Sequence, residues 1–126
     1  MIYFNTFANI NMHTLSIKDM INNNLAVSTE DGDIVYNAIN NSLQKGEKVV
    51  LDFNDIFVIT TAFLNVAIGK LYGNKEFNSE FLNHNIKLSN VAQDDIILFK
   101  KVIDTAKEYF KRKDIIDQSA NDAIDD

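Results

Sequence analysis

One stretch, residues 48–73, constrains the fold more than any other part of the chain. It opens with an apolar run at 49–51 and reaches four turn-forming positions, Asp52-Phe53-Asn54-Asp55. An apolar run without alternation, closed by turn residues, is typical of a strand that is covered on both faces. A second short apolar run, residues 56–59, follows, and we interpret it as a tight loop leading to two threonines.

The second half of this stretch predicts a helix. Thr60 and Thr61 stand where a side-chain oxygen can accept hydrogen bonds from the free N–H groups of a first helical turn. The apolar residues that follow are three and four positions apart, so they share one face of a helix. Gly73 then supplies the left-handed residue that commonly ends helices. The apolar face comprises Phe63, Leu64, Ala67, Ile68 and Leu71.

A strand, a loop and a helix in direct succession form half of a parallel-sheet unit, and this half resembles the centre of STAS domains. The residues that carry the resemblance are Asp52-Phe53 at the strand end, Thr60-Thr61 in the turn and Phe63 in the helix. They are most similar to bacterial STAS-like domains of unknown function, and the similarity continues through residues 86–91 to the helix near Asp94. It implies a single α/β domain over residues 1–113, with a mixed β-sheet covered by helices.

The remaining elements can be placed from capping residues and apolar spacing. The pattern predicts an early strand over residues 1–7, a second strand that begins at 10–12, a short helix capped by Ser16 and a longer helix from Ser28 to Gly46. It also predicts a strand over 86–91 and a last helix from about Gln93 to Lys113. Residues 114–126 contain five aspartates, so we expect them to form an acidic, flexible tail.

Composition excludes several classes of function. The net charge of −6 argues against nucleic-acid binding, which requires a basic surface. The chain has no cysteine, so a disulfide framework, a thiolate metal site and a cysteine nucleophile are impossible. We found no apolar run near the roughly 20 residues that span a bilayer and no signal-peptide pattern, so we expect a cytoplasmic protein. Seventeen asparagines and no proline suggest an AT-rich bacterial or phage genome.

The residues that could carry catalysis are scattered. His13 and His84 lie in unrelated segments without the spacing of a metal site. Asp52 and Asp55 could be read as a metal or acid–base pair, but we interpret them as caps of the turn after the strand. The glycines do not form a phosphate loop; Gly69, inside the predicted helix, is expected to permit a close approach. The sequence therefore predicts a protein that is not an enzyme and needs neither cofactor nor metal.

The expected site is the loop at the carboxyl end of the central strand, together with the start of the following helix. The resemblance implies regulation by binding a protein partner, which in this family is often a histidine-kinase-like ATPase. It also places Thr61 on the serine that partner kinases phosphorylate, although helix capping alone accounts for a threonine there. The alternative is a binding module for a nucleotide or another small ligand. The predicted partner-binding residues are Asn54, Asp55, Phe57, Thr60 and Thr61.

Overall fold

The computed structural model describes the backbone of residues 12–125 and the side chains of residues 12–118. The early strand expected over residues 1–7 lies outside the described residues. In chain order, the elements are β1 (Met12–Ser16), α2 (Ile17–Ile21), β2 (Leu25–Ala26), α3 (Thr29–Gln44), β3 (Lys48–Asp52), β4 (Val58–Ile59), α4 (Thr61–Ala67), the 3-10 helix η1 (Gly69–Gly73), α5 (Ser79–Asn85), β5 (Ile86–Ser89) and α6 (Gln93–Asp125).

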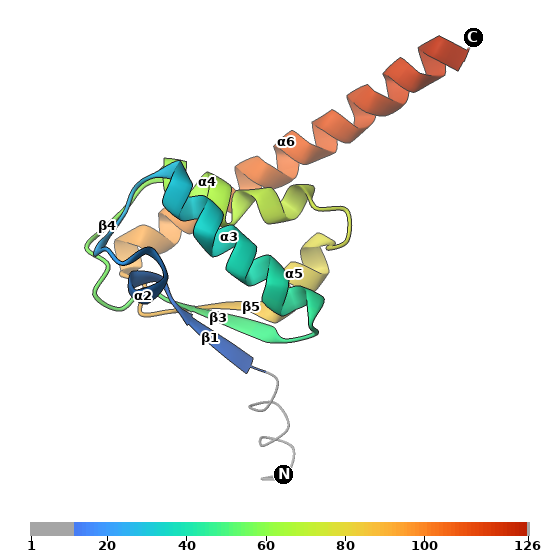
Figure 1. The fold of residues 1–126 in the computed structure, drawn as a ribbon. Coiled ribbons are helices and arrows are strands. Elements are labelled where there is room, and N and C mark those ends of the chain that lie inside the picture. The colour runs from blue at the N-terminus through green and yellow to red at the C-terminus, as the bar shows by residue number, and fades with distance from the viewer. Residues whose placement is uncertain (1–11, 126) are drawn as a thin grey trace.

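Three strands form the main sheet, in the order β1-β3-β5, with β3 in the centre. Both pairs are parallel, and the register places Leu51 between Leu15 and Leu88. The helices lie on one side of this sheet (Figure 1). The predicted α/β class and single domain are thus confirmed. Every strand pair among the described residues is parallel, whereas we had expected a mixed sheet.

Helices cover the central strand β3 on fewer faces than the sequence predicted. Along β3, Val49 and Leu51 are buried, Val50 is half-buried and Lys48 is exposed. In the described part of the chain the helices pack on one face only (Figure 1), whereas a strand covered on both faces was expected. The apolar run is only three residues long, and such a short run does not distinguish a one-sided strand from a two-sided one.

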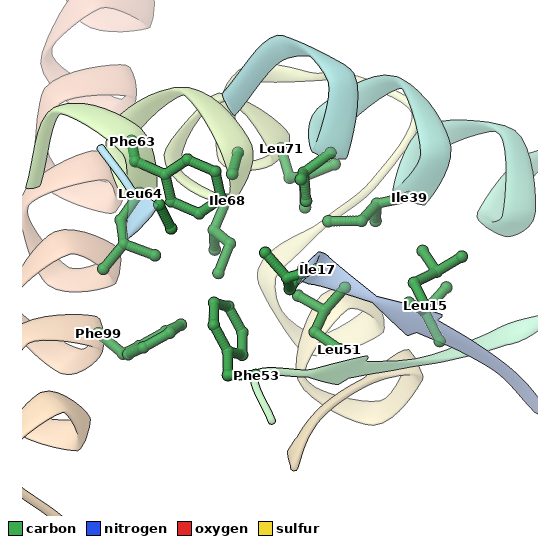
Figure 2. Packing of buried hydrophobic residues seen from close by; sticks show 14 of the residues in the cluster. Leu15, Ile17, Ile39, Leu51, Phe53, Phe63, Leu64, Ile68, Leu71 and Phe99 are labelled. Carbon is green, nitrogen blue, oxygen red and sulfur yellow. The ribbon is translucent and has the colours of Figure 1, made fainter. Parts of the chain in front are cut away.

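The core lies between the sheet and the helix layer. Figure 2 shows Phe63, Leu64 and Ile68 pointing from the helices toward Leu51 and Phe53 of the central strand region. Phe99 reaches the same core from α6, and its ring meets that of Phe53 edge-on at 5.2 Å between centroids. All five apolar residues predicted for the helix face after Thr61 are buried: Phe63, Leu64, Ala67, Ile68 and Leu71.

Capping residues place the helices where the sequence predicted them. The Ser16 and Ser28 side chains accept from the N–H groups of Asp19 and Asp31, at 3.3 and 3.1 Å. Gly46, with φ +78°, follows the end of α3, as expected. Gly73 is not left-handed, so that prediction is wrong. It ends η1, where an added Cβ would overlap the Phe110 ring.

The last helix is longer than expected. The sequence predicted an end near Lys113, but α6 continues to Asp125. No glycine or proline interrupts residues 111–125, so nothing in the local chemistry stops the helix. Phe99, Val102 and Ala106 are buried against the body, while residues 111–118 are all exposed. The final turns project away from the body (Figure 1).

Candidate partner-binding site

The site begins where the central strand ends. The Asp52 carboxylate accepts a hydrogen bond from the Asn54 N–H at 3.0 Å and another from the Asn90 amide at 2.8 Å. Asp52 therefore closes the turn after β3 and ties it to the end of β5. The interpretation of Asp52 and Asp55 as turn caps is confirmed for Asp52, whereas the Asp55 carboxylate lies 3.5 Å from Lys18 Nζ.

The apolar run at 56–59 is not a simple loop, as we had expected. Its second half forms β4, which pairs in parallel with β2 in a separate two-stranded sheet. Asn24 anchors this sheet: its side chain donates to the Asp55 carbonyl, and its own carbonyl accepts from the Phe57 N–H, both at 2.8 Å. Asp55 itself has φ +61°, the left-handed region. The segment after β3 is thus held in place by residues more than 30 positions earlier.

Thr60 is the N-cap of α4. Its hydroxyl accepts from the Phe63 N–H at 3.2 Å and donates to the Val27 carbonyl at 2.8 Å. The same side chain therefore caps the helix and fastens it to the segment after β2. Thr61 is the first residue of α4, and its side chain is exposed. Of the two threonines that could cap the helix, the structure assigns this function to Thr60.

Gly32 of α3 fixes the distance at which α4 packs. A Cβ at Gly32 would lie 2.8 Å from the Phe63 carbonyl oxygen and 2.9 Å from the Val66 Cβ. The two helices are so close here that only glycine fits without a shift. The sequence pointed to Gly69 for such a close approach, but a Cβ there would meet Ala106 at 3.7 Å, an ordinary contact.

The two-stranded sheet presents apolar side chains to solvent. Phe57 is 74% exposed, more than any other large hydrophobic residue among those described. Its neighbour Val58 is also exposed, while Ile56 and Ile59 are half-buried and pack against the core. Leu25 and Val27, on the paired segment, are exposed as well, and the strand register sets Leu25 beside Val58. We call these four residues, Leu25, Val27, Phe57 and Val58, the β2–β4 apolar patch.

One ion pair lies at the predicted site. Lys18 Nζ lies 3.5 Å from the Asp55 carboxylate, and both side chains are about half exposed. His13 lies elsewhere, with Nδ1 2.9 Å from the Ser42 hydroxyl. Among the described residues, no group of three or more His, Cys, Asp or Glu side chains could hold a metal ion.

The structure brings the predicted site residues into one continuous region. Asn54 and Asp55 form the turn, Phe57 projects from it, and Thr60 and Thr61 open α4. Leu25 and Val27 were not predicted as site residues, because the three asparagines before them, residues 22–24, show no pattern of a helix or a strand. The apolar Leu25-Ala26-Val27 run was the available signal, although two-residue strands fall below the usual length of a recognisable strand.

The hollows found on the surface lie elsewhere, mainly beside α6. One, of about 360 Å³, is lined by Tyr72, Phe110 and Asp114 among others. Burial, together with the nearby Asp104 carboxylate, raises the pKa of the Tyr72 hydroxyl. None of the five described hollows includes a residue between 54 and 61.

One family model matches the chain, over residues 31–95, and it describes a STAS-like domain of unknown function (DUF4325). The match covers just over half of the chain, from α3 to the start of α6, and it includes β3, β4 and α4. The chain belongs to this family of STAS-like domains, as the resemblance of its central stretch had implied. No curated protein and no solved structure matches it. None of the helices in residues 12–125 combines the length and the apolar character that crossing a membrane requires.

Proposed function

We propose that this chain is a non-enzymatic, cytoplasmic regulatory domain that binds a protein partner through the β2–β4 apolar patch and the first turn of α4. The observation that carries the proposal is the exposure of Phe57, at 74%, on a segment that is otherwise firmly anchored. A rigid, exposed aromatic side chain among other apolar groups is typical of an interaction surface.

The partner class follows from the family resemblance. In anti-sigma-factor antagonists, to which STAS-like domains are related, the partner is often a histidine-kinase-like ATPase, and we propose a partner of this class. The predicted contact residues Asn54, Asp55 and Thr61 are exposed beside the patch. The alternative, a nucleotide or small-ligand module, needs a concave site with convergent polar groups. None of the described hollows includes the loop, which favours protein contact.

The proposal is tested by capture of the partner from extracts of the native host. Wild type and Phe57→Asp are immobilised, and captured proteins are identified by mass spectrometry. A charge in the centre of an apolar contact leaves a desolvated carboxylate without a partner, so we expect Phe57→Asp to lose the specific partner. Ile97→Asp is the matched control, because Ile97 is 72% exposed and belongs to α6. Equal capture by wild type and Phe57→Asp, both folded by circular dichroism, would rule out contact through the patch.

A phosphate switch at Thr61 is the second part of the proposal. The Thr61 side chain is exposed, so a kinase could reach it, while Thr60 performs the capping. If phosphorylation regulates binding, Thr61→Glu should release the captured partner and Thr61→Ala should retain it constitutively. If both variants bind as wild type does, Thr61 is not the switch, and contact through the patch stands without it.

A further inference from the structure

The C-terminal part of α6 is exposed: Lys113, Asp114 and Asp117 line an open hollow beside Tyr72, but none of them is buried against the body. Residues 111–118 are all exposed, and the helix continues to Asp125. We call residues 111–125 the α6 extension; it is roughly 20 Å long at 1.5 Å per residue. Isolated helices of about 12–15 residues are marginal in water, and helices in proteins are stabilised mostly by packing of an apolar face. The extension continues a helix that the body already anchors, and packing of its apolar face against a second surface would stabilise it further.

An apolar seam runs along the outside of this helix. Tyr109 and Ile116 are 60% and 65% exposed, and they lie seven residues apart. Seven residues are nearly two full turns, so both side chains are on one face. Two exposed apolar side chains on one face can both contact a second helix that lies alongside.

Basic and acidic residues occupy different parts of the helix: the basic ones come first and the acidic ones follow. Lys113 and Asp117, four residues apart, flank the seam on the same side, and within residues 12–118 neither forms an ion pair. The order Lys before Asp is the less favourable one within a single helix. Residues 107–113 contain four basic residues and one acidic residue, whereas residues 114–126 contain five aspartates and no lysine or arginine. Such a helix complements a second copy of itself in antiparallel orientation.

We propose that two copies of this chain associate through their α6 extensions, antiparallel and centred near Ile116. In that register each Lys113 lies within about two residues, roughly 3 Å along the axis, of the position of Asp117 on the second helix. The two-fold symmetry produces this pairing twice. The two Ile116 side chains meet at the centre of the seam.

The body carries a small apolar hollow at the root of the extension, where the end of the second helix would lie. A hollow of about 290 Å³ opens beside Tyr109, and its other lining residues include Gly69, Lys70 and Ala106. In the proposed register, position 123 of the second helix lies opposite Tyr109, and the described helix reaches Asp125. The seam therefore continues from the extension onto the body. The overlap is shorter than a standard protein interface, so we expect a weak, concentration-dependent dimer.

Sedimentation equilibrium of the full chain, from about 10 µM to about 1 mM, tests the proposal, since this range includes weak associations. Wild type should show a monomer–dimer equilibrium. Lys113→Asp and Asp117→Lys should each weaken the dimer at least about tenfold, because each places like charges across the interface. An equimolar mixture of the two variants restores both opposite-charge pairs, so it should recover the dimer. Lys111→Asp, the same charge change on the opposite face of the helix, is the matched control and should associate as wild type does.

Orientation is tested with single cysteines, because the native chain has none. Ile116→Cys should form an intermolecular disulfide rapidly, since the two positions meet near the symmetry axis. Ile124→Cys should not, because antiparallel helices separate the two positions by roughly 24 Å. Three results would each overturn the proposal: a monomer at every concentration, a dimer that is as tight in both charge variants as in wild type, or faster crosslinking through Ile124→Cys than through Ile116→Cys.

Discussion

At the scale of single residues, the position of α4 depends on two small groups, the missing side chain of Gly32 and the hydroxyl of Thr60. Gly32 lets α4 approach α3, and Thr60 fastens the start of α4 to the Val27 carbonyl. Both act on the helix whose first turn borders the β2–β4 apolar patch. Both residues are small, yet they determine where the first turn of α4 lies.

Gly32→Ala should destabilise the fold by about 1–3 kcal/mol, the usual range for overpacking. The added Cβ meets the Phe63 carbonyl oxygen, which belongs to the backbone and cannot rotate away. Gly69→Ala is the control, because its Cβ meets Ala106 at an ordinary 3.7 Å. Urea denaturation of both variants measures the difference. Equal stability of the two variants would mean that α3 and α4 are not packed this closely.

Thr60→Ala should cost about 1–2 kcal/mol, the upper part of the range for an N-cap, because it also loses the bond to Val27. Thr61→Ala should change the free energy of unfolding by less than about 0.5 kcal/mol, as for an exposed substitution. Thermal or urea unfolding distinguishes the two. A larger loss in Thr61→Ala than in Thr60→Ala would show that the cap has been assigned to the wrong threonine.

At the scale of elements, the sequence predicted the helices that begin at a recognisable capping residue. Ser16, Ser28 and Thr60 cap their helices as their positions suggested. The pairing of β2 with β4 could not be predicted, because it depends on contacts such as that between Asn24 and the backbone of Asp55 and Phe57. Only part of the patch could therefore be predicted from the sequence. Phe57 was predicted as a contact residue, whereas Leu25 and Val27 belong to the site only because β2 pairs with β4.

The central strand should be the most sensitive element of the sheet. Leu51 is fully buried between β1 and β5, beneath the helix layer. Leu51→Ala should therefore destabilise the protein by about 2–5 kcal/mol, the range for a buried leucine. Chemical denaturation measures this value, and a change of under about 0.5 kcal/mol, typical of surface positions, would show that β3 is not central.

At the scale of the whole molecule, the chain consists of a STAS-like body and a helix that leaves it. Phe99, Val102 and Ala106 attach α6 to the body, and the exposed residues beyond Phe110 contribute nothing to its core. The body carries the proposed partner surface, and the α6 extension carries the proposed dimer surface. The two surfaces involve different residues, so loss of one does not imply loss of the other.

Deleting residues 118–126 should leave the thermal midpoint nearly unchanged at about 10 µM, where a weak dimer is largely dissociated. The last residue before the deletion already lies in an exposed segment of the helix. Differential scanning calorimetry of the two chains measures the effect. A fall of several degrees would mean that the deleted residues pack against the body.

The central claim, that a protein partner covers the β2–β4 apolar patch, is tested most directly by hydrogen exchange of the chain with and without its captured partner. Amide groups in covered segments exchange more slowly. We predict that protection in the complex is concentrated at residues 24–27 and 55–63, with little change along residues 96–113. Protection confined to α6, with residues 24–27 and 55–63 exchanging as in the free protein, would contradict the account.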